Sequence, residues 1–251
     1  MDQINQVIPR KTICLFDVDG TLTKPRNKIT PDMDSFLDKL SEKMDIGIVG
    51  GSDLLKIQEQ MGSREITTRF PTVFAENGII AYVGGILQKT ETIQSYMGED
   101  KLQTLINFCL EYMSKLRLPC KRGNFIEFRT GLINVSPVGR SCSQSERDAF
   151  SEYDAQHKIR EQFVSVLKEK FAEEYGLTFS IGGQISIDIF PQGWDKTFCL
   201  RYLKEYDQIY FFGDKTLPGG NDYEIFSDTR TIGYSVSNPE DTKRILTDLF
   251  S

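Results

Sequence analysis

The 251-residue sequence predicts an α/β fold in which an inserted α+β cap domain interrupts a parallel-sheet core. Short, continuous apolar runs occur near both ends of the chain, and such runs are typical of strands buried on both faces of a sheet. Amphipathic helical patterns alternate with the first of these runs. The middle of the chain instead combines charged helices with glycine-centred hairpins. We therefore expect a discontinuous core of residues 1–86 and 192–251 and a cap of residues 87–191.

The N-terminal part of the core is expected to alternate strands with helices. Thr12–Phe16 and Ile46–Val49 are the apolar runs. Thr30–Asp32 supplies an N-cap, a proline in the first turn and an early acidic residue for a helix that begins there. A second helix is expected over Asp53–Met61. This order indicates parallel strands joined by right-handed crossovers.

The remaining elements follow from periodicity and from glycines at turns. Helices are expected over 99–116 and 143–175, and hairpins over 79–88, 124–135 and 177–190. Near the C-terminus we expect strands over 209–212 and 231–236 and a helix over 239–250, with Asn238 as its N-cap.

Composition excludes several classes of function. The net charge is −6, and no basic stripe offers itself to nucleic acid. The five cysteines form no CxxC pair, and no secretory leader or apolar run of membrane-spanning length is present. These observations predict a cytoplasmic protein without a membrane segment. His157 is the only histidine and is expected at the surface, so carboxylates are left to perform any acid/base chemistry.

Three of the strands that are predicted to be buried on both faces end in loops rich in polar groups. These loops are Asp17–Thr21, Gly51–Asp53 and Gly213–Asp214. In open α/β sheets, ligands bind at the carboxyl ends of the strands, so these loops should converge on one site. Carboxylates crowded in one loop are costly to ionise together, and a divalent cation such as Mg²⁺ relieves that cost. Gly20 is expected to allow the sharp turn, and the Thr21 side chain to hold it by a hydrogen bond.

The aspartates of the first loop, Ser52 and the later Lys196 each also have an ordinary structural interpretation. Asp-Val-Asp-Gly can be a plain strand-to-loop turn, Ser52 a helix N-cap and Lys196 a solvated helix residue. Their order along the chain favours the functional interpretation. Asp-x-Asp-Gly-Thr after an apolar strand is similar to the nucleophile motif of the haloacid-dehalogenase superfamily, which has a Rossmann-like core. This resemblance implies that Asp17 is the nucleophile, Asp19 the general acid/base, Ser52 a donor to phosphoryl oxygens and Lys196 a balancing cation.

Longer strings resemble one family within that superfamily, the eukaryotic phosphomannomutases. They include FDVDGTLTKPRNKI, GIVGGSD, NFIEFRTGLINVSPVGRSCSQSERDAF and YFFGDKTLPGGNDYEIF. The resemblance implies interconversion of mannose 6-phosphate and mannose 1-phosphate through an aspartyl-phosphate enzyme and a hexose 1,6-bisphosphate, which also acts as activator. It further implies Mg²⁺, a supply of mannose 1-phosphate for GDP-mannose, and a homodimer formed through the caps.

Three cap arginines stand out in an otherwise acidic chain, because guanidinium groups recognise phosphate in bidentate fashion. Scattered surface charge is the alternative explanation. The family resemblance implies that Arg129, Arg140 and Arg147 bind the phosphate far from the nucleophile. It also assigns substrate contacts to Arg26, Ser186 and Asp188. For metals it implies a first site at Asp17, Asp19, Asp214 and Asn221 and a second at Phe226 (through its carbonyl), Asp228 and Thr231.

Several alternatives remain open at this level. The apolar positions Leu102, Leu105, Ile106, Cys109 and Leu110 suit either a dimer interface or the core of the cap. A sugar-phosphate phosphatase of the same superfamily, a preference for glucose phosphates, and a catalytically idle binding protein each agree with parts of the pattern.

Overall fold

The computed structural model describes residues 11–62 and 65–250 and divides the chain into two compact units. The core unit consists of Met1–Thr90 and Asp195–Ser251, and the cap unit of Glu91–Trp194. Each boundary lies a few residues beyond the predicted one. The short strand Ile86–Leu87 pairs within the core sheet, so the core extends past it. At the other boundary Trp194 stays with the cap, because its N–H donates to the Pro191 carbonyl and its ring packs on Tyr96.

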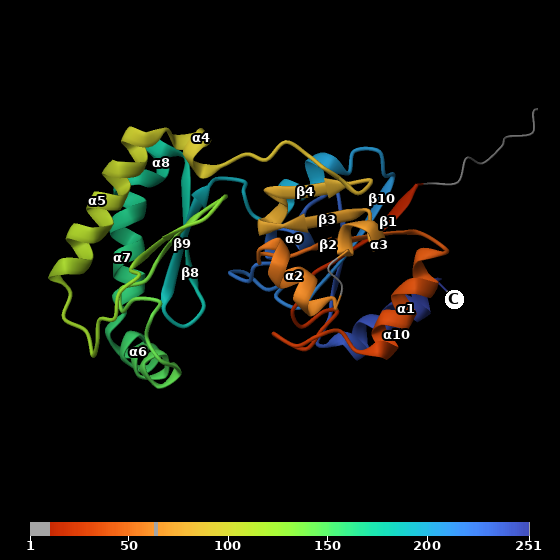
Figure 1. Ribbon diagram of the computed structural model, residues 1–251, viewed down its shortest axis with the longest axis horizontal. Coiled ribbons are helices and arrows are strands. Elements are labelled where there is room, and N and C mark those ends of the chain that lie inside the picture. Colours follow the sequence, from red (N-terminus) through yellow and green to blue (C-terminus); the bar gives the residue numbers. More distant parts are fainter. Residues whose placement is uncertain (1–10, 63–64, 251) are drawn as a thin grey trace, which may run out of the picture. The chain divides into compact units, whose positions relative to one another are not determined.

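A seven-stranded sheet of order β11-β10-β1-β2-β3-β4-β5 forms the centre of the core (Figure 1). The first five strands in this order are parallel, and the last two pair antiparallel. The strands are β1 Thr12–Phe16, β2 Asp45–Val49, β3 Thr72–Ala75, β4 Ile80–Val83, β5 Ile86–Leu87, β10 Gln208–Gly213 and β11 Ile232–Ser235. The parallel-sheet prediction is confirmed. β3 had not been predicted, and the hairpin over 79–88 completes the core sheet.

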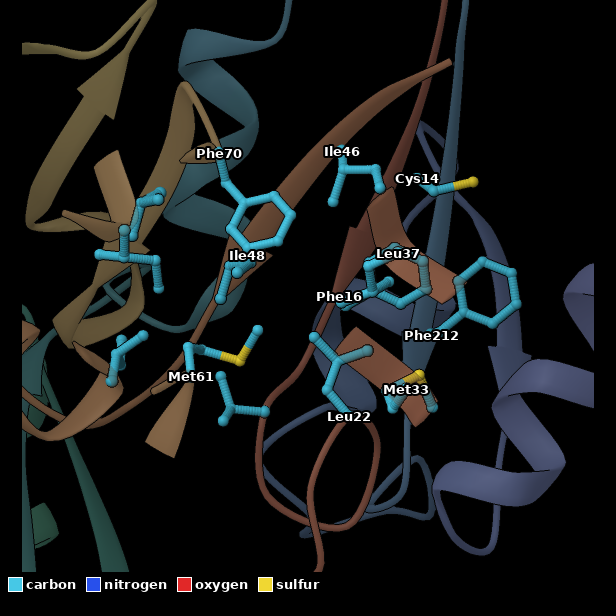
Figure 2. Packing of buried hydrophobic residues seen from close by; sticks show 14 of the residues in the cluster. Cys14, Phe16, Leu22, Met33, Leu37, Ile46, Ile48, Met61, Phe70 and Phe212 are labelled. Atoms are coloured by element: carbon cyan, nitrogen blue, oxygen red, sulfur yellow. The ribbon is translucent and has the colours of Figure 1, made fainter. Parts of the chain in front are cut away.

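Alternation along the strands gives the sheet two apolar faces. Cys14 and Phe16 of β1 join one hydrophobic cluster, and Ile13 and Leu15 of the same strand join the other. Figure 2 shows Phe16 beside Phe212, and their rings stack at 5.1 Å. Burial on both faces explains why these strands appear in the sequence as continuous apolar runs.

The helices of the core cover both faces. They are α1 Pro31–Ser41, α2 Leu54–Gln60, α3 Ile66–Arg69, η1 Glu76–Gly78, η3 Lys196–Tyr202, α9 Tyr223–Ser227 and α10 Pro239–Phe250. Helix α1 begins as predicted, with the Thr30 hydroxyl accepting from the Met33 N–H at 3.3 Å. Asn238 likewise caps α10, since its side chain accepts from the Asp241 N–H at 2.9 Å.

The cap unit is a four-stranded antiparallel sheet of order β6-β7-β9-β8 with helices on one face (Figure 1). Its strands are β6 Ile126–Phe128, β7 Ile133–Val135, β8 Leu177–Gly182 and β9 Ser186–Pro191. Its helical segments are α4 Ile93–Met97, α5 Glu99–Lys115, α6 Gln144–His157, α7 Ile159–Leu167, the π-helical η2 Lys168–Ala172 and α8 Glu173–Tyr175.

The span 143–175 is helical as predicted, but it is divided at a point that the sequence pattern does not reveal. Lys158 adopts a left-handed conformation at φ 55° and ends α6, after which a new helix begins. His157, at the end of α6, is exposed, as expected.

The apolar residues of α5 resolve one of the open alternatives. Leu102, Leu105 and Cys109 are buried in the hydrophobic cluster of the cap, and Ile106 packs against that cluster. Leu110 alone among the five is exposed, at 46%. Core packing therefore accounts for four of these residues. Among the described residues no helix is both long and apolar enough to cross a membrane.

A buried ion pair holds the tip of the β8–β9 hairpin to the helices. Arg160 and Asp154 are each 7% exposed, and the Arg160 Nε donates to the Asp154 Oδ2 at 2.7 Å. The Arg160 Nη1 also donates to the Gly183 carbonyl at 2.8 Å. One guanidinium thus links the junction of α6 and α7 to the turn that leads into β9.

Replacing Arg160 by Ala should release this turn, because it leaves the Asp154 carboxylate buried without its partner. We expect a loss of about 3–5 kcal/mol of local stability. Hydrogen exchange at the amides of residues 182–186 should accelerate by roughly two orders of magnitude or more. Lys158→Ala is the matched control, because Lys158 is exposed and pairs with Glu161 at 3.6 Å. Unchanged exchange in the Arg160 variant would contradict the role given to the ion pair.

Candidate active site

The loop after β1 places a carboxylate in a buried, charged environment. The Asp17 N–H donates to the Phe212 carbonyl of β10 at 2.9 Å, and Asp17 is 4% exposed. The Lys196 ammonium contacts the Asp17 Oδ1 and lies 2.5 Å from the Asp222 Oδ1. Lys196 is the first residue of η3, whose N-cap is Asp195. The predicted pairing of Asp17 with Lys196 is therefore present in the folded chain.

A third carboxylate completes the cluster. Asp17, Asp214 and Asp222 present oxygens within 4.8 Å of one another, and no other such group of acidic, histidine or cysteine side chains occurs in residues 11–62 and 65–250. Asp222 is fully buried and also accepts from the Lys215 N–H at 3.0 Å. Lys196 balances only one of these three negative charges. Carboxylate oxygens so arranged fit a hard divalent cation such as Mg²⁺.

Burial and neighbouring charge act together on these groups. Burial raises the pKa of Asp17 to about 7, with Lys196 lowering it and Asp222 and Asp214 raising it further. Burial also raises the pKa of Asp214. Burial disfavours the charged form of Lys196, but the two carboxylates it contacts outweigh that effect and raise its pKa. The lysine therefore stays cationic while Asp17 holds a proton unusually readily.

Gly20 is required by the close approach of two loops. Its φ is +81°, and a Cβ at this position would lie 2.4 Å from the Asp214 Oδ2. The expected turn at Gly20 is confirmed. The expected role of Thr21 is wrong, because its hydroxyl is buried without a hydrogen-bond partner among the described residues. Thr23 instead donates from its side chain to the Val18 carbonyl at 3.3 Å.

Asp19, the second aspartate of the motif, is held by two donors on one oxygen. Its Oδ1 accepts from the Arg26 backbone N–H at 2.6 Å and from the Gln60 side chain at 2.7 Å. Gln60 is 2% exposed at the end of α2, and its contact with Asp19 was not predicted from the sequence. Arg26 lies in an exposed loop at φ 62°, with its backbone next to this aspartate.

A cavity of about 200 Å³ joins these groups. Its lining includes the loops that follow β1, β2 and β10. Ser52 lies in this lining, and its carbonyl accepts from the Glu76 N–H at 2.9 Å. The residues that line the cavity are Asp17, Val18, Asp19, Gly50, Gly51, Ser52, Ile57, Gln60, Asp214, Lys215 and Asn221. Five of the predicted core-site residues are thus brought to one cavity, and Lys196 lies buried against Asp17.

The residues expected to form a second cation site lie around the end of α9. Both carboxylate oxygens of Asp228 accept from Arg230, at 2.8 Å to the Nε and 2.7 Å to the Nη2. Thr231 donates from its side chain to the Ile225 carbonyl at 2.5 Å and the Asp228 carbonyl at 3.1 Å. A cation that uses the Asp228 carboxylate must therefore compete with Arg230 for it. The carbonyl of Phe226, the third expected ligand, belongs to the same segment.

The cap carries a second cluster of polar side chains, which we call the cap arginine network and which consists of Glu127, Arg129, Asn134, Arg140 and Asp188. Glu127, Asn134 and Asp188 are cross-strand neighbours on β6, β7 and β9. Glu127 accepts from the Arg129 Nε at 2.6 Å and from the Arg140 Nε at 2.7 Å. Asn134 accepts from the Arg140 Nη1 at 2.7 Å and donates to the Asp188 Oδ1 at 2.6 Å.

The other predicted cap residues border this network. Arg147 donates from its Nη2 to the Arg140 carbonyl at 2.8 Å, so its guanidinium braces the backbone that carries Arg140. Ser186 precedes Asp188 by two positions on β9 and is 5% exposed. Glu127 and Asn134 were missed from the sequence. Their alternation on short strands was the available signal, but it does not reveal which arginines they contact.

Comparison with known proteins assigns the chain to a family. The model of the family described as eukaryotic phosphomannomutase matches residues 33–251. The chain belongs to the eukaryotic phosphomannomutase family. It is 57% identical to a phosphomannomutase of Oryza sativa subsp. indica over 238 residues, which cover 95% of each chain. It is also 57% identical to phosphomannomutase 1 of Dictyostelium discoideum over 242 residues, or 95% of this chain and 96% of that one.

Solved structures extend this comparison at the level of the fold. A protein described as related to trehalose-6-phosphate phosphatase aligns with 94% of this chain and 96% of its own, at a TM-score of 0.57 and 15% identity. This shared fold agrees with the predicted α/β fold class.

Lys196→Ala tests the charge balance of the site. It should lower the free energy of unfolding by about 3–5 kcal/mol near pH 8, because two buried carboxylates lose their cation. The cost should shrink toward pH 5, where the raised pKa allows Asp17 to become neutral. Urea unfolding with EDTA present measures both effects, with the exposed Lys204→Ala as control. If the variant is as stable as the parent protein at pH 8, Lys196 does not stabilise the fold by compensating these two carboxylates.

Proposed function

We propose that this protein interconverts mannose 6-phosphate and mannose 1-phosphate through an aspartyl-phosphate on Asp17 and a hexose 1,6-bisphosphate. Membership of the eukaryotic phosphomannomutase family supports this reaction. The observation that carries the mechanism is the buried Asp17 carboxylate, which is in contact with Lys196 and lies beside Asp19 at the same cavity. A nucleophile, an acid/base and a fixed cation are the groups that phosphoryl transfer to a carboxylate requires.

Asp17 acts as nucleophile in this mechanism. Its carboxylate oxygen attacks phosphorus of the bisphosphate, and the bond from phosphorus to the sugar oxygen breaks. Asp19 gives a proton to that departing oxygen. In the next half-reaction mannose 6-phosphate enters, Asp19 takes the proton of its C1 hydroxyl, and the C1 oxygen attacks the phosphoryl group on Asp17. The resulting bisphosphate turns over, and its 6-phosphoryl group returns to Asp17 as mannose 1-phosphate forms.

The neighbouring groups stabilise the charge on the phosphoryl group during transfer. Lys196 holds the nucleophile in position and offsets charge, and the Ser52 hydroxyl is suited to donate to a phosphoryl oxygen. Gln60 and the Arg26 N–H fix the Asp19 carboxylate through one oxygen, so the other oxygen remains for proton transfer.

When bound, Mg²⁺ supplies further positive charge at the transferring group. The residues that would hold it are Asp17, Asp214 and Asp222, with Asp19 and Asn221 adjoining.

The cap supplies recognition of the second phosphate. Arg129, Arg140 and Arg147 are suited to this role because guanidinium groups bind phosphate in bidentate fashion. Arg26 is proposed as a further phosphate contact, and Ser186 and Asp188 as contacts to phosphate or sugar hydroxyls. The second cation site at Phe226, Asp228 and Thr231 belongs to the same proposal.

Several wider features complete the proposal. The protein works in the cytoplasm, forms a homodimer through its caps and supplies mannose 1-phosphate for GDP-mannose and protein glycosylation. A hexose 1,6-bisphosphate primes Asp17. The direct test follows mannose 1-phosphate and free phosphate together, starting from mannose 6-phosphate, Mg²⁺ and catalytic glucose 1,6-bisphosphate. Mannose 1-phosphate with little free phosphate supports the mutase. Release of free phosphate alone would make the protein a phosphatase.

Asp17→Asn should abolish turnover, with a loss of at least about 10⁴-fold in kcat, because the amide cannot accept the phosphoryl group. The fold should persist, since Asn matches Asp in shape. Turnover is measured in the coupled assay, and acid-quenched protein is weighed by mass spectrometry for the added phosphoryl group. Appreciable turnover or phosphorylation of this variant would refute the assignment of the nucleophile.

Arg140→Ala should weaken binding of a hexose 1,6-bisphosphate by roughly 10- to 150-fold, which corresponds to about 1.5–3 kcal/mol for hydrogen bonds to a charged group. Binding of a small monophosphate ester should change far less, because it lacks the second phosphate. Isothermal titration of an Asp17→Asn background compares the two ligands without turnover. Arg122→Ala is the control, since Arg122 pairs with Glu146 instead. Equal losses for both ligands would argue against the cap-phosphate role.

Mg²⁺ binding should weaken as the pH falls, because the cation needs the ionised carboxylate and Asp17 has a pKa of about 7. Protonation of Asp17 competes with the metal below that value and no longer matters well above it. We expect affinity about tenfold lower at pH 6 than at pH 8, with protons released on binding. Calorimetry in two buffers of different ionisation enthalpy measures both quantities. Equal affinities with no proton release would contradict Asp17 as a ligand.

A further inference from the structure

We propose that Glu127 is a built-in counter-anion that keeps the cap arginines from holding phosphate too tightly. This inference rests on the proposed function, in which Arg129 and Arg140 bind the distal phosphate. Glu127 then tunes the affinity of that site and sets how readily the bisphosphate leaves it. Its role differs from that of a ligand contact, because it acts through the two arginines.

The geometry places Glu127 between the two guanidinium groups. Its Oε1 accepts from the Arg129 Nε at 2.6 Å, and its Oε2 accepts from the Arg140 Nε at 2.7 Å. One carboxylate therefore occupies the Nε edge of each arginine. The side chains are partly exposed, at 31% for Glu127, 33% for Arg129 and 28% for Arg140. Both of these contacts use the Nε atom, so Nη groups of the two partly exposed side chains are where an anion would bind while Glu127 stays in place.

The two arginines favour the ionised form of Glu127. Burial raises the pKa of this carboxyl, but Arg129 and Arg140 outweigh that effect and hold the pKa below its usual range. The two arginines and the glutamate together carry a net charge of +1. Without the glutamate, a phosphate dianion would meet two guanidinium groups with Asp188 as the remaining carboxylate of the cap arginine network. Glu127 thus reduces both the mutual repulsion of the arginines and their attraction for phosphate.

Asn134 contacts the same arginine without altering its charge. It accepts from the Arg140 Nη1 at 2.7 Å and donates to the Asp188 Oδ1 at 2.6 Å. Asn134 therefore orients Arg140, whereas Glu127 both orients and neutralises. This contrast separates the two effects, because removing the neutral partner should only weaken phosphate binding.

A mutase gains from such moderation. Its bisphosphate has to leave the distal site and return with the opposite phosphate in that site, once in every cycle. Without the negative charge of Glu127, Arg129 and Arg140 would bind the first phosphate more tightly and slow this exchange. Binding that is equally tight before and after transfer adds nothing to turnover.

The test compares Glu127→Gln with Asn134→Ala in the full chain. On an Asp17→Asn background, isothermal titration with glucose 1,6-bisphosphate should give a Kd at least about fivefold tighter for Glu127→Gln, because one unit charge beside the phosphate is removed. Asn134→Ala should give a weaker Kd. With Asp17 intact, Glu127→Gln should lower KM and kcat together, a pattern that loss of a merely structural contact would not produce.

The control variant changes a glutamate that pairs with a different arginine. Glu146→Gln is matched, because Glu146 pairs with Arg122 at 2.7 Å outside the cap arginine network, and it should leave Kd within about twofold. The tightening should also disappear once Arg129 and Arg140 are both alanine. A weaker or unchanged Kd in Glu127→Gln would overturn the counter-anion role even if the parent is an active mutase. Absence of mutase activity in the parent would instead overturn the proposed function.

Should Glu127→Gln fold poorly, Glu127→Asp provides the second measurement. The shorter side chain keeps the charge but cannot reach both Nε atoms at their present distances. It should weaken binding or leave it unchanged if charge is what limits affinity. Tighter binding in Glu127→Asp would overturn the proposal.

Discussion

The contact of one buried lysine with two buried carboxylates is the constraint on which the rest of the core depends. Lys196 lies between Asp17 and Asp222, and these three residues come from η3 and from the loops after β1 and β10. Each charge would be expensive to bury alone, so the three segments stabilise one another only when all are in place. The remaining excess of negative charge, with Asp214 at its edge, explains why the same arrangement is suited to a cation and a phosphoryl group.

The sheet explains how such charges can be held at one edge. Strands β1, β2 and β10 are buried on both faces, so their polar residues are confined to the loops that follow. Parallel pairing aligns those loops, as the register of Phe16 with Phe212 shows. In the cap, polar side chains lie on the sheet itself. Its sheet is antiparallel and covered by helices on one face, which leaves the other face for a row of polar side chains.

Residues next to strand ends could be predicted from sequence, because local pattern determines their position. Asp17, Asp19 and Asp214 directly follow apolar runs or their turn glycines, and Lys196 follows the cap in a recognisable string. Asp222 and Gln60 were not predicted because their roles depend on contacts between distant segments, for example the 41-residue separation of Gln60 and Asp19. Glu127 was not predicted because the strand pattern does not reveal which arginines it contacts. The break at Lys158 also escaped, because lysine rarely adopts a left-handed conformation and the flanking sequence remains helical in pattern.

The pairing of β1 with β10 has a consequence for biosynthesis. Thr12 lies opposite Gln208, so β1 leaves the ribosome well before a partner that is encoded after the entire cap. During that interval one edge of the nucleophile strand is open, and a nascent chain ending inside the cap contains neither Lys196 nor the acidic loop beyond it. The cap, whose contacts lie within one continuous segment, can form earlier. Assembly of the core is therefore a late event that depends on long-range strand pairing, which is slow compared with local folding.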